Sequence, residues 1–344
     1  LALCTDNLPD VAVTPSEHFN TITYTGTDST TNNVNGVGFA PDWVWLKRRN
    51  AATSHALFDK VRGANKVLGS NTTNAEQTDS GSGFSSFDSD GFTVVEHLSA
   101  SGQINLGNMV SWNWKANGAG SQNTSGTINT TATSANVDGG FSIITYTGNG
   151  TSGATIGHGL SKAPEFITIK RRNSGGDDWN TYYGDNTDQI KLNSTAATAD
   201  NDAIWNDTSP SSTLITLGNH AEVNNNNDTY VAYAFHSVDG YSKVGSYEGN
   251  GNADGTFVYT GFRPALVITK PIDATGNWNI NDSVRSPDNV VDERLKPNSS
   301  DAESDSDALD FTSNGFKIRT SGTSYNQSAY TYIYIAFAET PFKY

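Results

Sequence analysis

The chain has 344 residues, of which 36 are acidic and 21 are basic, so its formal net charge is −15. This charge opposes binding to nucleic-acid phosphates and to anionic membranes, and no apolar run approaches the roughly 18 residues that a membrane helix needs. The single cysteine, Cys4, excludes a disulfide within the chain. Charged residues make up only 17%, and Asn, Thr, Ser and Gly are abundant, which favours an all-β fold.

The first predicted strands follow a leader and alternate with turns. One strand ends at Tyr24-Thr25-Gly26, and the next, behind Pro41, is apolar on both faces up to Lys47. We place this second strand in the middle of a sheet because both of its faces must be covered. A closing strand over 110–115 alternates bulky and polar residues, as a half-buried strand does, which predicts that its tryptophans lie in the core.

This order of elements recurs twice, so an internal repeat sets the architecture. The spacing from the tyrosine to the proline is 17, 18 and 17 residues in the three copies. The later copies open at Tyr146 and Tyr247, continue behind Pro164 and Pro264, and end the central strand at Lys170 and Lys270.

The repeats predict three tandem antiparallel β-sandwiches, jelly-roll-like and arranged in series, with Val44, Ile167 and Val267 at equivalent buried positions. The expected boundaries are a leader at 1–18, sandwiches at 19–117, 139–238 and 239–344, and a connector at 118–138 that holds a short strand at 127–131.

Candidate sites are few. Each Lys-Arg-Arg run, at 47–49 and 170–172, follows a strand and is expected to be solvated there. The string Asp88-Ser-Asp90-Gly91 lacks the remaining ligands of a calcium loop and predicts a hairpin turn. Neither a metal site nor a cofactor site is predicted. No catalytic motif is present, and a carboxylate pair for glycoside hydrolysis cannot be chosen among 36 acidic residues.

Trp205 is the one candidate for stacking on a carbohydrate. It lies in the polar segment 200–207, which predicts an exposed loop, whereas Trp43, Trp45, Trp112 and Trp114 lie in predicted strands and are assigned to the core.

Several strings together resemble a β-rich module of tailed bacteriophages, especially marine and cyanobacterial ones. They are the Tyr-Thr-Gly openings and the strings 39–49, 54–63, 87–92 and 334–344. The module recurs in tail-fibre and other appendage proteins, and the resemblance covers essentially the whole chain. It implies a location on a virion or outside the cell, and it carries no catalytic signature. The second copy departs most, because it lacks the strings of 54–63 and 87–92.

The first hypothesis is therefore a non-enzymatic virion structural protein, a tail-fibre, appendage or decoration subunit that contacts host-surface glycans. As its partners we expect identical subunits, other virion proteins and host-surface glycans, and neither nucleic acid nor membrane. A carbohydrate-active enzyme or its binding modules is the alternative, and a bacterial surface adhesin or filament is a third possibility. An enzyme should concentrate new Asp, Glu and Trp residues in one copy, but the acidic residues are spread widely.

Overall fold

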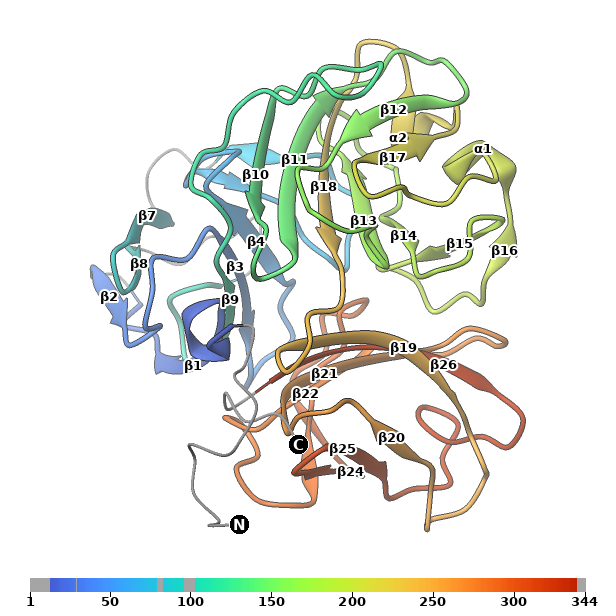
Figure 1. The fold of residues 1–344 in the computed structure, drawn as a ribbon. Helices are drawn as coiled ribbons and strands as arrows, with labels where there is room; N and C mark the ends of the chain where they lie inside the picture. The colour runs from blue at the N-terminus through green and yellow to red at the C-terminus, as the bar shows by residue number, and fades with distance from the viewer. Residues whose placement is uncertain (1–12, 29, 79–82, 96–102, 339–344) are drawn as a thin grey trace, which may run out of the picture.

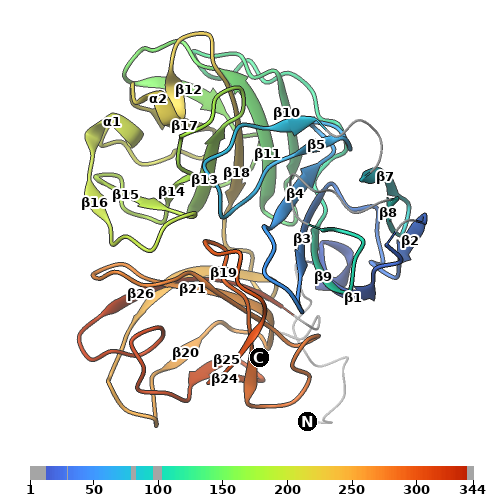
Figure 2. The same ribbon diagram turned by 180° about the vertical axis from the view of Figure 1, so that it is seen from behind.

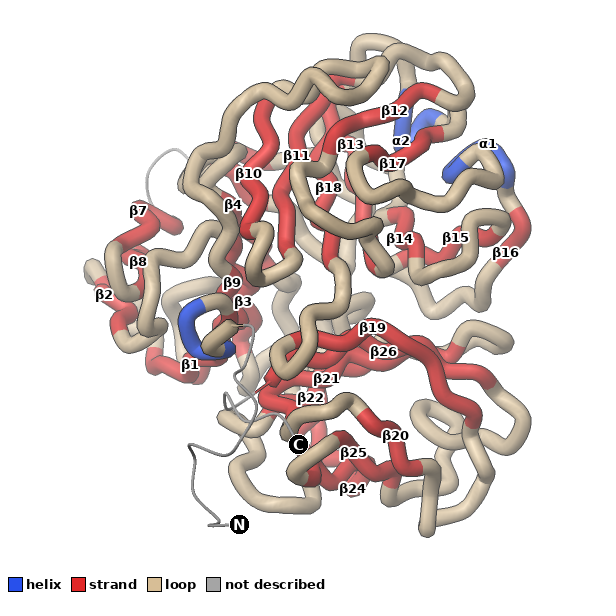
Figure 3. The backbone as a smooth tube through the Cα atoms, in the orientation of Figure 1, coloured by secondary structure: helices blue, strands red, loops and turns tan. Residues whose placement is uncertain are grey.

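A computed structural model describes residues 13–28, 30–78, 83–95 and 103–338, and they form a nearly all-β protein of antiparallel sheets (Figures 1 and 3). Most of the expected leader, including Cys4, lies outside the described residues, as do the last aromatics, Phe342 and Tyr344. We call residues 19–117, 139–238 and 239–344 the first, second and third segments.

The described part of the first segment and the turn before it contain one short helix and nine strands. They are η2 (Pro15–Glu17), β1 (Phe19–Thr25), β2 (Asn32–Asn35), β3 (Trp43–Arg48), β4 (Ala56–Asp59), β5 (Lys66–Val67), β6 (Gln77–Thr78), β7 (Phe84–Asp88), β8 (Gly91–Val94) and β9 (Asn108–Trp114).

The strand before the second segment and the second segment itself carry two helical turns. The elements are β10 (Ala132–Asn136), β11 (Phe141–Thr147), β12 (Ala154–Gly157), β13 (Phe166–Arg171), β14 (Asn180–Tyr182), β15 (Asp188–Lys191), β16 (Ala199–Asp200), α1 (Asp202–Trp205), β17 (Leu214–Leu217), α2 (Ala221–Asn224) and β18 (Thr229–Phe235).

The described part of the third segment contains strands and turns. Its strands are β19 (Ser242–Glu248), β20 (Phe257–Tyr259), β21 (Pro264–Pro271), β22 (Asn279–Asp282), β23 (Val291–Arg294), β24 (Ser304–Thr312), β25 (Gly315–Ile318) and β26 (Thr331–Ala338).

One order of strands occurs in all three segments. It reads β1-β9-β3-β4, then β11-β18-β13-β14 within a larger sheet, then β19-β26-β21-β22. The strand behind each proline is internal in its sheet, as predicted. Val44, Ile167 and Val267 are fully buried at the same place along these strands, three residues before the lysine, which confirms that prediction.

A second layer covers one face of each of these sheets. The covering strands are β2-β8-β7, β12-β17 and β20-β25-β24-β23, and each pair of layers encloses its own apolar cluster. Within these clusters Phe58 stacks on Phe84 at 4.5 Å between ring centroids, and Tyr146 stacks on Tyr230 at 5.0 Å.

The opposite faces of the three sheets meet in one shared aromatic cluster, which we call the hub. Trp43 of the first segment stacks on Tyr233 and Phe141 of the second, at 4.4 Å and 5.6 Å between ring centroids. Trp114 contacts Phe337 of the third segment at 5.6 Å. The expectation of sandwiches in series is therefore wrong, because the segments surround a common core (Figures 1 and 2). The tryptophans assigned to the core are all buried.

The expected connector is part of the fold. Its last residues form β10, which pairs with β11 from Ala132↔Thr145 to Asn136↔Phe141. The short strand expected at 127–131 is absent, and this range contains only an isolated β-bridge from Ile128 to Ile156. The strand of the connector, β10, begins at Ala132. A Gly-, Ser- and Thr-rich composition therefore did not distinguish an edge strand from a linker.

Candidate functional site

Trp205, the predicted stacking residue, is buried, so the expectation that it is exposed is wrong. It ends the helical turn α1, which begins after Asn201, whose side chain accepts a hydrogen bond from Ala203 N at 3.2 Å. The turn directs Trp205 inward, where it is 1% exposed and meets the edge of Tyr182 at 5.6 Å. The polar neighbours in the sequence predicted a surface loop, but a single helical turn was enough to bury the ring.

The lysines of the Lys-Arg-Arg runs are also buried, which corrects the expectation of solvated strand ends. Lys170 Nζ donates hydrogen bonds to Thr73 O at 3.2 Å and Asp177 O at 2.6 Å, so it joins the second segment to the first. Lys270 Nζ reaches Ala196 O at 2.9 Å and joins the third segment to the second. Burial lowers the pKa of Lys47, Lys170 and Lys270 to about 8 in each case.

The arginine two residues further on forms an ion pair across a junction between segments. Arg172 binds Glu76 of the first segment, with Nε to Oε2 at 2.8 Å, and Glu76 also binds Arg62 at 3.0 Å. Arg62 forms an ion pair with Asp59, and both side chains are fully buried. Burial opposes the charge of Arg62, but Asp59, Tyr233 and Glu76 together outweigh this effect and raise its pKa.

The junction between the first and third segments repeats this network. Arg49 binds Glu303 at 2.7 Å, Glu303 binds Arg285 at 2.8 Å, and Arg285 binds Asp282 at 2.5 Å. At the corresponding place between the second and third segments, Thr198 N donates to Ile272 O at 3.0 Å, so a neutral pair replaces the arginine and the glutamate.

Ring nitrogens join the same three junctions. Trp179 Nε1 donates to Gly69 O at 2.9 Å, and Trp278 Nε1 donates to Lys191 O at 3.0 Å. His55 Nε2 lies 2.9 Å from Lys296 O, while Trp45 Nε1 donates to His55 Nδ1 at 2.8 Å. Burial holds the pKa of His55 well below its usual value. The imidazole is therefore neutral, with its proton on Nε2.

The repeated tyrosine-glycine openings have a structural role. Tyr24, Tyr146 and Tyr247 each donate a hydroxyl hydrogen bond to a backbone carbonyl 77 to 80 residues further on. Two residues after each tyrosine, a Cβ would lie within 2.2–2.4 Å of backbone atoms, so only glycine fits. These motifs close each segment and do not form a binding site.

Two exposed aromatic side chains were missed by the sequence reasoning. Phe257 and Tyr259 are 44% and 58% exposed and lie on the same face of the edge strand β20, with Val258 buried between them. In the first segment, Asn33 and Asn35 flank Val34 in the same way. The sequence Phe-Val-Tyr could have revealed this pair, because successive side chains of a strand point to opposite faces of the sheet. If Val258 faces the core, Phe257 and Tyr259 must both face outward.

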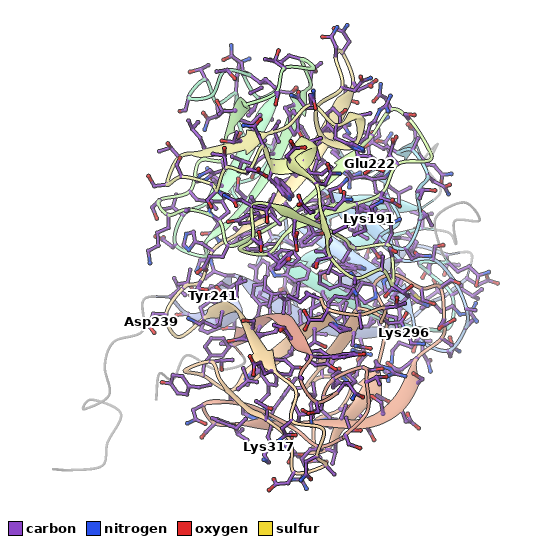
Figure 4. The ribbon with its side chains drawn as sticks, turned by 90° about the vertical axis from the view of Figure 1, so that its right-hand side faces the viewer. Lys191, Glu222, Asp239, Tyr241, Lys296 and Lys317 are labelled. Carbon is purple, nitrogen blue, oxygen red and sulfur yellow. The ribbon has the colours of Figure 1, made fainter. Side chains whose placement is uncertain are left out.

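The surroundings of this pair carry compensated charge. Phe257 is paired across the strands with Lys317, whose ammonium group binds Asp254 at 2.7 Å. Lys317 lies at the end of the third segment that points away from the other two (Figure 4). The aromatic pair is thus displayed on a part of the surface that is not used in the hub.

A match to a domain family of unknown function (DUF7483) spans residues 14–341. The chain belongs to this family. Comparison with curated proteins and with solved structures gave no match. The family region covers the three segments together, in agreement with their shared hub.

Two acidic side chains, Asp90 and Glu222, are engaged in local structure. Asp90 accepts hydrogen bonds from Gly36 N at 3.1 Å and Gly38 N at 2.6 Å, and β7 and β8 pair around it as the predicted hairpin. Glu222 accepts from Asp178 N at 3.0 Å and Asn180 Nδ2 at 2.7 Å, near Lys191 (Figure 4).

Among the described residues, no group of three or more His, Cys, Asp or Glu side chains is arranged to hold a metal ion. No helix in the described part of the chain is long and apolar enough to cross a membrane.

Proposed function

We propose that the chain is a non-enzymatic structural protein of a tailed-phage virion, located outside the host cell, and that it contacts host-surface glycans. It would serve in a tail fibre, in another appendage or as a decoration subunit. The support for a structural role is that its charged and ring side chains hold three sheets around one hub. Such a scaffold displays surface features rigidly.

We also infer that the three segments are diverged copies of one antiparallel β-sandwich. The same strand order and the same strand register at Lys47, Lys170 and Lys270 support this inference. The tethers support it further: the ring-nitrogen contact recurs at all three junctions, and the arginine–glutamate pair recurs at two. Lys170 and Lys270 also reach across a junction, whereas Lys47 Nζ donates within the first segment. Loss of the charged tether at one junction then reflects divergence after duplication.

The proposed contact with glycans rests on Phe257 and Tyr259. Aromatic side chains present a large apolar face, and Tyr is enriched at binding interfaces because its ring is apolar and its hydroxyl is polar. The apolar faces of sugar rings are suited to such a platform. Because the neighbouring Lys317 is already paired with Asp254, the platform favours a neutral sugar ring.

The test is a glycan array probed with the wild-type chain and with a Phe257→Ala/Tyr259→Ala double variant. Both residues are exposed, so the double variant should fold normally and lose about tenfold or more in binding, since each aromatic contact contributes about 1 kcal/mol. Val137→Ala, at a side chain that is 46% exposed in another part of the surface, is the matched control and should bind as the wild type does.

Three outcomes would contradict parts of the proposal. Equal binding by the double variant and the wild type would remove the aromatic pair from the site. No binding by the wild type would refute the glycan contact and favour a spacer or decoration role. Release of reducing sugar from a bound polysaccharide would identify an enzyme.

A further inference from the structure

A hollow of about 370 Å³ opens in the third segment, beside β23 and β24 and the loop that follows β25. Its polar lining consists of Arg294, Ser306, Thr320, Ser324 and Tyr325. None of the described residues that line it is acidic. Its volume is in the range of small-molecule sites, which begins at roughly 300 Å³.

Two buried polar atoms in this lining, Arg294 Nε and Ser306 Oγ, make no hydrogen bond of good geometry. Both side chains lie beside the Tyr325 hydroxyl, which itself donates to Asn281 Oδ1 at 2.8 Å, and Arg294 Nη2 has a long hydrogen bond to Ser304 Oγ at 3.3 Å. Poorly paired buried donors are costly in a native protein, and an occupant that accepts both hydrogens would reduce this cost.

In the first segment the described residues at the corresponding place are apolar and buried. Arg294 and Val67 correspond, because each precedes a leucine that forms a bridge to the neighbouring strand. Tyr325 and Ile104 correspond, because the carbonyl of each accepts the hydroxyl of its segment's opening tyrosine. Val67 and Ile104 are buried in an apolar cluster. The third segment therefore places an arginine and hydroxyl groups where the first has a close-packed core.

We propose that this hollow binds an acidic monosaccharide, with the sugar carboxylate on the Arg294 guanidinium and the Ser306 hydroxyl. An arginine holds a carboxylate by two parallel hydrogen bonds. The hydroxyl groups of Ser306, Thr320 and Ser324 match those of a sugar ring. One arginine without an acidic neighbour in the described lining selects a single negative charge, and the net charge of −15 disfavours a polyanion. The site lies apart from the aromatic pair and does not depend on the proposed role in a virion.

The experiment is an isothermal titration calorimetry measurement, in which the full chain is titrated with D-glucuronate and, separately, with D-glucose. Glucuronate should bind in the millimolar range, as expected for a small ligand held by one ion pair, and glucose should bind about tenfold more weakly. No binding of glucuronate, or equal binding of the two sugars, would overturn the proposal.

Two variants and a control assign the binding to the hollow. Arg294→Gln should weaken glucuronate binding about tenfold or more, and Ser306→Ala should weaken it severalfold. Arg319→Gln removes an exposed arginine of the same segment, which lies 3.4 Å from Asp310, and should leave binding unchanged. Thermal unfolding of each variant shows whether it is folded. Ser306→Ala removes a single hydroxyl and keeps the test decisive if Arg294→Gln does not fold. Unchanged binding in the folded pocket variants, or an equal loss in Arg319→Gln, would overturn the assignment.

Discussion

Three lysines at the same strand position end inside the protein, although lysine at the end of a strand usually reaches solvent. Backbone carbonyls accept hydrogens from all three ammonium groups. For Lys170 and Lys270 an accepting carbonyl belongs to the neighbouring segment, which covers the strand end, whereas Lys47 donates to Arg48 and Ala51 of its own segment. The sequence showed that all three central strands end on lysine. It could not show the cover, because the cover comes from residues far away in the chain.

The buried lysines predict how stability depends on pH. Their pKa values are about 8 in the folded chain and about 10.4 in an unfolded one. Between these values the unfolded chain binds more protons, so the free energy of unfolding should rise with pH. Above about pH 10 the buried tyrosines, whose pKa values are raised by burial, should reverse the trend.

Urea unfolding at about pH 7 and about pH 9.5 measures the effect. The midpoint should be higher at the upper pH, and the increase should be smaller in Lys170→Met, which removes one of the three groups. A wild-type urea midpoint that is lower at about pH 9.5 than at about pH 7 would contradict the assignment.

The glycine of each tyrosine-glycine opening gives a second prediction at this scale. In Gly26→Ala the new Cβ would lie 2.2 Å from the backbone carbon of Asn105, so the loop must move. We expect a loss of about 1–3 kcal/mol in the free energy of unfolding, as for other overpacked sites. Gly175→Ala, where the Cβ would have ordinary contacts of 3.4 Å or more, is the control. Equal stability of the two variants would contradict the role of the glycine.

At the scale of elements, two junctions between segments are held by arginine–glutamate ion pairs, and the third has a hydrogen bond between backbone groups at that place. Glu76 and Glu303 each bind two arginines, whereas Thr198 makes a backbone hydrogen bond to Ile272 at the equivalent place. The charged networks are buried and geometrically specific, which suits them to fixing the relative position of the segments.

Asp59→Asn tests the buried network at the first junction. The substitution leaves Arg62 without its fully buried ionic partner, so the free energy of unfolding should fall by about 3–5 kcal/mol. Asp254→Asn removes the partner of Lys317 at the surface, and its urea midpoint should match that of the wild type. Equal midpoints for the two variants would show that the buried pair does not stabilise the junction.

The sequence predicted the strands better than their packing. Alternation at Val110, Trp112 and Trp114 identified a buried face, and the lysine-ended strands are central in their sheets as expected. The alternation did not reveal what covers that face, since a tandem repeat determines each unit but not the contacts between units. Trp205 was misplaced because its sequence neighbours are polar, whereas one helical turn directs its ring into the core of the second segment. The hollow beside Arg294 was not foreseen because its lining comes from separate parts of the third segment.

At the scale of the whole molecule, the hub makes three sheets one structural body. Trp43 alone stacks on two rings of the second segment, and Phe337 of the third segment contacts both Trp114 and Phe235. A segment cannot unfold without exposing the apolar faces of the other two. The proposed attachment surfaces both lie in the third segment, on a scaffold that the first two help to hold rigid.

Differential scanning calorimetry of the full chain tests this central claim most directly. Because the core is shared, unfolding should be one cooperative transition in which the calorimetric and van't Hoff enthalpies agree. Sandwiches that fold independently would instead give separate transitions, or a calorimetric enthalpy well above the van't Hoff value. That result would contradict the account of one body built around a common hub.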